Sequence, residues 1–128
     1  MKQFAALYDA IDATTATSEK VAALVAYFQA AEPADAALAV SFLVGRRPKR
    51  LVKAADLRAW AAEAADIPAW LFEESYAQTG DLAEAISLLV PEPEATADAS
   101  LAWWVEQRLL PLATMEPAEQ RLALRAAW

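Results

Sequence analysis

A single stretch of this sequence concentrates the side chains that could bind a ligand by charge. Six of the eleven lysines and arginines lie between Arg46 and Arg58, together with one acid, Asp56. That window carries a net charge of +5, whereas the other residues include five basic and 17 acidic ones and carry −12. An acidic protein that gathers its positive charge in one place is typical of proteins that bind a polyanion, most commonly a phosphate backbone.

The densest part of this window is residues 45–53, Gly-Arg-Arg-Pro-Lys-Arg-Leu-Val-Lys, which we call the basic segment. The candidate phosphate contacts are Arg46, Arg47, Lys49 and Arg50, with Lys53 and Arg58 as weaker candidates further along the chain. Arginine suits such contacts because its fork of donors matches phosphate oxygens. The alternative is a solvated loop that balances neighbouring acids, since runs of like charge are often only surface.

Other kinds of chemistry have little support in the sequence. The chain contains no cysteine and no histidine, so it lacks a thiolate nucleophile, the usual general base and the commonest metal ligands. Acidic pairs such as Asp9/Asp12 and Glu73/Glu74 are typical of solvated helix faces, because no acid–base partner accompanies them. We therefore expect no catalytic residue, no metal site and no cofactor in this chain.

The composition indicates an all-α protein. The length of 128 residues suits one domain, 58% of the residues are hydrophobic, and two glycines interrupt a chain rich in alanine, the strongest helix former. No apolar run reaches the roughly 18 residues of a membrane span, and the N-terminus lacks the layout of a secretory signal. We expect a soluble, cytoplasmic protein with no membrane partner.

Start and stop signals divide the chain into seven or eight helices. They predict helices over 2–12, after a cap at Thr17 or Ser18, over 33–44, from Lys53 or Ala54, from Pro68 to Gly80, from Asp81 to Val90, from Ser100 and from Pro117. The basic segment is then a loop that leaves a helix at Gly45. We expect one domain, with a helical core over 1–90, a proline-containing acidic linker over 91–99 and C-terminal helices over 100–128. The last helical pattern is unbroken at Trp128, which suggests a chain cut from a longer one.

Apolar spacing along these helices predicts the core. The expected core residues are Leu24, Phe28, Phe42, Trp60, Trp70, Leu71 and Ile86. The adjacent Trp103 and Trp104 cannot both face one core, because neighbours on a helix point about 100° apart.

Gly80 and Asp81 form a second candidate site. Their simplest interpretation is a helix stop followed by the N-cap of the next helix. The functional alternative is that the start of this helix offers backbone N–H groups to a phosphate.

Several blocks of the chain resemble bacterial ATP-dependent DNA ligases. The blocks are Phe42–Val52, Ile67–Tyr76 and Thr79–Ile86, in that order, and the opening from Phe4 to Val25 is similar too. In the family these blocks belong to an all-helical N-terminal DNA-binding domain. The resemblance covers nearly the whole chain, and its specific parts are the basic block and the Gly-Asp-Leu block.

The resemblance implies non-sequence-specific binding of nicked duplex DNA through phosphates. In the family, downstream catalytic domains carry the adenylated lysine in a Lys-x-Asp-Gly motif, use ATP and Mg²⁺, and seal nicks in DNA repair, replication or recombination. None of the four lysines here is followed by x-Asp-Gly, so we expect a non-enzymatic fragment that ends before the family's helical domain is complete. Its partners would be DNA of the bacterial nucleoid and the catalytic domains. The rival is a helical protein-interaction module whose basic loop binds an acidic partner.

Overall fold

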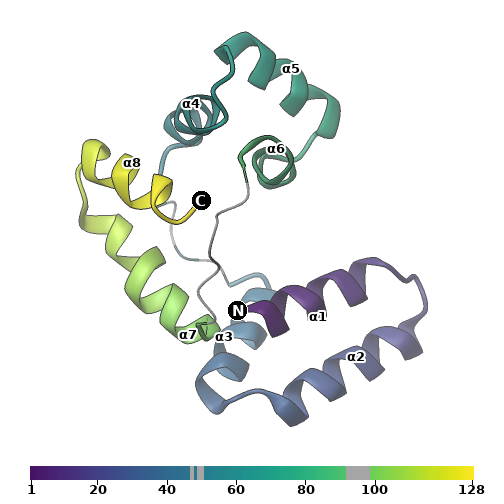
Figure 1. Ribbon diagram of the computed structural model, residues 1–128. Helices are drawn as coiled ribbons and strands as arrows, with labels where there is room; N and C mark the ends of the chain where they lie inside the picture. The colour runs from purple at the N-terminus through teal and green to yellow at the C-terminus, as the bar shows by residue number, and fades with distance from the viewer. Residues whose placement is uncertain (47, 49–50, 92–98) are drawn as a thin grey trace. The chain divides into compact units, whose positions relative to one another are not determined.

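The fold is all-α, as the sequence predicts. A computed structural model describes residues 1–46, 48, 51–91 and 99–128, and within these ranges it contains eight α-helices and no strand (Figure 1). The helices are α1 (Lys2–Asp12), α2 (Thr17–Ala30), α3 (Pro33–Leu43), α4 (Ala54–Ala64), α5 (Ala69–Thr79), α6 (Leu82–Leu89), α7 (Leu101–Trp104) and α8 (Pro117–Arg125). None of the helices in the described ranges is both long and apolar enough to cross a membrane.

The predicted helix ends are confirmed at most positions. Pro33 and Pro117 occupy first-turn positions, and the side chains of Asp81 and Ser100 cap the helices that follow them. The predicted cap of the second helix is wrong. The helix begins at Thr17, the N-cap is Ala16, and no side chain caps it.

The described helices pack as two compact units. The first unit comprises Met1–Lys49 and Ala97–Leu110, and the second comprises Arg50–Thr96 and Pro111–Trp128. Most of the predicted linker, residues 92–98, lies outside the described residues. The assignment of the whole chain to a single domain stays a prediction.

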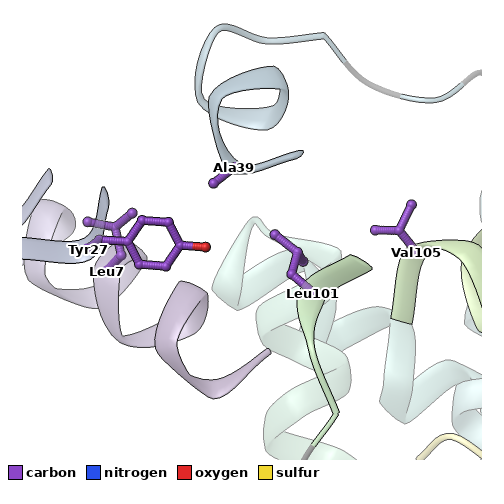
Figure 2. Packing of buried hydrophobic residues seen from close by; sticks show 5 residues of the cluster. All are labelled: Leu7, Tyr27, Ala39, Leu101 and Val105. Atoms are coloured by element: carbon purple, nitrogen blue, oxygen red, sulfur yellow. The ribbon is translucent and has the colours of Figure 1, made fainter. Parts of the chain in front are cut away.

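The first unit is built on the pairing of α1 with α2 and of α3 with α7. Its buried cluster takes one side chain from each of these four helices and one from the residue that follows α7 (Figure 2): Leu7, Tyr27, Ala39, Leu101 and Val105. Asp35 on α3 also ties α7 in place. Its carboxylate accepts the N–H groups of Leu101 (3.0 Å) and Ala102 (2.8 Å), which have no partner inside their own helix.

The second unit has its core at the crossing of α4, α5 and α6. The buried cluster is Ala61, Ala62, Phe72 and Ala85, and Phe72 is the largest side chain in the described structure that is fully buried. The small alanine side chains let the helices approach closely around the one phenylalanine ring.

The predicted core is right for the first unit and partly wrong for the second. Leu24, Phe28 and Phe42 pack against the first cluster, and Ile86 packs against the second. Trp60 is half-buried, whereas Trp70 and Leu71 are 67% and 38% exposed. The reason is that α5 turns the next residue, Phe72, inward, and neighbours on a helix cannot share that direction.

The helix that begins at Leu101 changes its winding after Trp104. Residues Val105–Leu109 form a π-helical turn, and Leu110–Thr114 form a 3₁₀ segment. Pro111 accounts for the change, because proline lacks an N–H and its ring clashes with the carbonyl four residues earlier. As the sequence predicts, the two tryptophans do not both face the core: Trp103 is 39% exposed, Trp104 is half-buried, and their rings pack edge to face.

Candidate nucleic-acid interface

The basic segment begins at a closed helix end. Gly45 has a φ of +79°, and its N–H donates to the carbonyl of Phe42 (3.0 Å). The N–H of Arg46 donates to the carbonyl of Ser41 (2.9 Å), and these two bonds form the Schellman motif that ends α3. The backbone of Arg46 is therefore fixed to the end of α3, although the sequence predicts that this residue lies in a ligand-binding loop.

Arg46 presents its side chain to solvent. The residue is exposed, as is Pro48 two positions later. The other three principal candidates, Arg47, Lys49 and Arg50, lie outside the described residues. A cation at the C-terminal end of a helix also favours the helix macrodipole, so Arg46 contributes to helix stability whatever else it binds.

Lys53 lies at the N-terminal end of a helix, whereas Arg46 lies at a C-terminal end. It is the N-cap of α4, it is exposed, and its carbonyl accepts the N–H of Leu57 (3.0 Å). A cation is unfavourable at a helix N-terminus, and Asp56 in the first turn supplies the compensating negative charge. The stability of the helix therefore gives no reason for a lysine at this position.

The side chain of Arg58 interacts with two other side chains of the protein. Its Nε lies 3.0 Å from Oε1 of Glu73, and its guanidinium carbon lies 5.9 Å from the ring centroid of Tyr76. The Nε atom is buried but its contact with Glu73 lacks the alignment of a hydrogen bond, so this is an ion pair by distance alone. In the described parts of the chain the other ion pair joins Arg121 to Glu63, and neither pair involves Arg46 or Lys53.

Gly80 and Asp81 join α5 to α6 in the second unit. Gly80 has a φ of +74°, and its N–H donates to the carbonyl of Tyr76 (2.9 Å). The Oδ1 atom of Asp81 accepts the N–H of Glu84 (3.0 Å), so a carboxylate already stands at the N-terminus of α6. A phosphate at this position would face that negative charge.

One further residue of the site has no signal in the sequence. Gln120 is the buried polar residue of the described structure, and its Nε2 donates to the carbonyl of Leu51 inside the basic segment (3.1 Å). A lone glutamine on a surface helix is an ordinary residue in a sequence, and the contact spans 69 positions.

The described residues show no cluster of metal-binding side chains. No group of three or more acidic side chains gathers where it could hold a metal ion within the described ranges. Burial, and secondarily the negative charge of Asp35, raises the pKa of Tyr27, which keeps this phenol neutral in the core of the first unit. The exposed cations of the basic segment, Arg46 and Lys53, can bind an anion.

Comparison with known proteins identifies the family. The family model described as "DNA ligase N terminus" matches residues 1–128. The chain belongs to the family of N-terminal domains of ATP-dependent DNA ligases. No curated protein and no solved structure matches the chain in the corresponding comparisons.

Membership of the DNA ligase N-terminal family confirms the resemblance and the all-α fold. It gives this chain a role in an ATP-dependent DNA ligase, as a domain of that protein. The assignment of individual residues to DNA contact, and the bacterial origin, stay predictions.

Proposed function

We propose that this DNA ligase N-terminal domain binds nicked duplex DNA through its phosphates, without sequence specificity. One observation carries the proposal: a chain of net charge −7 places six of its eleven basic residues between Arg46 and Arg58. Phosphate contacts fix position and affinity but carry no sequence information, which suits an enzyme that must seal nicks in any sequence.

The contacts that we propose come from the basic segment. Arg46 is exposed, with its backbone fixed by the Schellman motif, so a phosphate can bind it without reordering its main chain. Lys53 is exposed at a helix end where a cation has no stabilising role. The sequence adds three more cations to the same segment: Arg47, Lys49 and Arg50.

We interpret the remaining candidates, Arg58, Gly80 and Asp81, as residues that stabilise the fold. Arg58 pairs with Glu73 and lies over Tyr76, so a phosphate contact would compete with both interactions. Gly80 and Asp81 end one helix and cap the next, and the Asp81 carboxylate would repel a phosphate there.

We assign the chemistry of nick sealing to the other domains of the ligase. Adenylation with ATP and Mg²⁺ needs a lysine in a Lys-x-Asp-Gly motif, and this chain has none. The domain would then act in the cytoplasm, on DNA in repair, replication or recombination, by holding the duplex for the catalytic domains.

The proposal is tested by replacing four cations in the complete ligase. In the loop variant, Arg46, Arg47, Lys49 and Arg50 are changed to alanine. Each phosphate contact contributes about −0.9 to the slope of log affinity against log salt, so the slope should flatten by roughly 3 to 4 units on nicked duplex. Fluorescence anisotropy with labelled DNA at several salt concentrations measures this slope.

A matched control removes the same charge elsewhere. Lys2, Lys20, Arg121 and Arg125 are changed to alanine, which lowers the net charge equally and, among the ion pairs of the described residues, breaks the exposed one between Arg121 and Glu63. The control should keep the wild-type slope. An equal slope in the loop variant and the wild type would contradict the proposal, and binding of an acidic protein in place of DNA would favour the rival interaction module.

A further inference from the structure

Gln120 connects three segments of the second unit through one buried amide. Its Nε2 donates to the carbonyl of Leu51 (3.1 Å) and to the carbonyl of Leu112 (2.8 Å). The side chain extends from α8, and the residue is 9% exposed. Both donors of the amide are therefore used within the protein.

The orientation of this amide is fixed by its partners. Both partners are carbonyl oxygens, which only accept hydrogen bonds, so the nitrogen must face them. A carboxylate has no hydrogen to donate, and an apolar side chain has none either. Neither glutamate nor methionine could hold the two carbonyls.

Among the described residues, Gln120 is the one donor to the Leu51 carbonyl, whereas the Leu112 carbonyl has a further donor. The Leu112 carbonyl also accepts the N–H of Met115 (3.4 Å), whereas Leu51 lies outside the helices. Leu51 is half-buried and follows Arg50 directly, and its carbonyl shares a peptide plane with the N–H of Val52. Lys53 comes next, at the start of α4.

We propose that Gln120 is a positioning residue for DNA binding, which rests on the function proposed above. By holding the Leu51 peptide, it fixes the point at which the basic segment ends and α4 begins. The other end of the segment is fixed in a different way, by the backbone bonds of Gly45 and Arg46 to α3. Without Gln120, the Leu51 peptide would have to become ordered when DNA binds. The entropy lost in this ordering would weaken the binding of DNA.

The first test measures the Leu51 peptide directly in the 128-residue chain. In Gln120→Met, the ¹⁵N order parameter of the Val52 amide should fall from about 0.85 toward 0.6, while the amides of α5 keep their values. In the wild type, the side-chain amide protons of Gln120 should exchange with water more slowly than those of the exposed Gln107. This second measurement needs no variant, and exchange as fast as that of Gln107 would overturn the proposal.

The second test measures DNA affinity in the complete ligase. Gln120→Met should bind nicked duplex roughly fivefold or more weakly, because one backbone unit must be ordered on binding. Its salt slope should stay at the wild-type value, since the phosphate contacts of the bound state are kept. The loop variant differs in that it flattens the slope.

The control for a purely structural effect is Ile86→Val. Ile86 packs against the second unit's core and is not a partner in the hydrogen bond between Gln120 and Leu51, so this variant loses stability while that bond is kept. Folded Ile86→Val should bind DNA like the wild type. Wild-type affinity in Gln120→Met, together with a flattened slope in the loop variant, would overturn the inference alone; an unchanged slope in the loop variant would overturn the proposed function instead.

Discussion

The ends of α3 and α5 begin alike and lead to different structures. Gly45 and Gly80 have φ angles of +79° and +74°, and a Cβ added to either would meet no atom within 4 Å. After Gly45 the chain continues with an exposed arginine, whose N–H closes the end of α3. After Gly80 it continues with Asp81, which caps α6 at once.

The two glycines have the same conformation, so the two helix ends differ through the residue that follows each glycine. A cation after Gly45 leaves an exposed positive charge on a fixed backbone. An acid after Gly80 occupies the N-terminus of the next helix and uses its donors. The two helix ends therefore share one glycine conformation but carry opposite charges on the residue after the glycine. We propose that only the first end, at Arg46, contacts a phosphate.

The largest expected effect on stability comes from the glycines themselves. Gly45→Ala and Gly80→Ala should each lower the free energy of unfolding by about 1–2 kcal/mol, because an L-residue is strained in the left-handed region. Chemical denaturation measures both losses, which should be similar since neither site lacks space. Only Gly45→Ala should also weaken DNA binding, because it disturbs the backbone of Arg46.

The matched controls are Gly45→Asn and Gly80→Asn, which should lose less stability because asparagine tolerates this conformation better. A larger loss of DNA affinity in Gly80→Ala than in Gly45→Ala would contradict the proposal that the end of α3, and not the end of α5, contacts DNA.

The cap at Asp81 should have the next largest effect. Asp81→Ala removes the acceptor of the Glu84 N–H and should cost about 1 kcal/mol of folding stability. The same change removes a negative charge, so DNA affinity should stay the same or rise slightly. A marked fall in affinity, measured at a temperature where the variant is fully folded, would show that the Gly80–Asp81 turn contacts DNA.

A third helix end of the same kind lacks glycine and gives the smallest expected effect. Asp66 has a φ of +53° after α4, and the N–H of Ile67 donates to the carbonyl of Ala62 (3.1 Å) as in the Schellman motif. Asp66→Gly should raise the free energy of unfolding by about 0.5 kcal/mol, the relief of strain less the added entropy of the unfolded chain. Destabilisation would show that the aspartate side chain has a role of its own.

The helix ends were predictable from the sequence because single residues specify them. Proline, glycine and capping residues act through their own backbone geometry or a bond three residues away, as at Pro33, Gly80 and Asp81. The end of α4 at Asp66 has no such signal in the sequence, because aspartate is seldom left-handed. The π-helical turn differs from the regular helix predicted from Ser100, although Pro111 inside a helical pattern is a signal for such a change.

The buried faces were less predictable because alanine-rich helices are apolar on several sides. On α5 the choice lay between Trp70, Leu71 and Phe72, and the spacing alone does not decide which of three adjacent apolar residues faces inward. Prediction of the candidate site from the sequence is limited in the same way. Its cations are visible in the sequence, whereas the engagement of Arg58 with Glu73 and of Gln120 with Leu51 depends on tertiary contacts.

The most direct test of the account compares two arginines of the same window. Arg46→Gln and Arg58→Gln remove the same charge, one from the exposed end of α3 and one from an ion pair on α4. Both are measured in the complete ligase, on one nicked duplex, over the same range of salt. We expect Arg46→Gln to flatten the slope of log affinity against log salt by about 0.9 and Arg58→Gln to leave it unchanged. A slope that flattens in Arg58→Gln and not in Arg46→Gln would contradict the account.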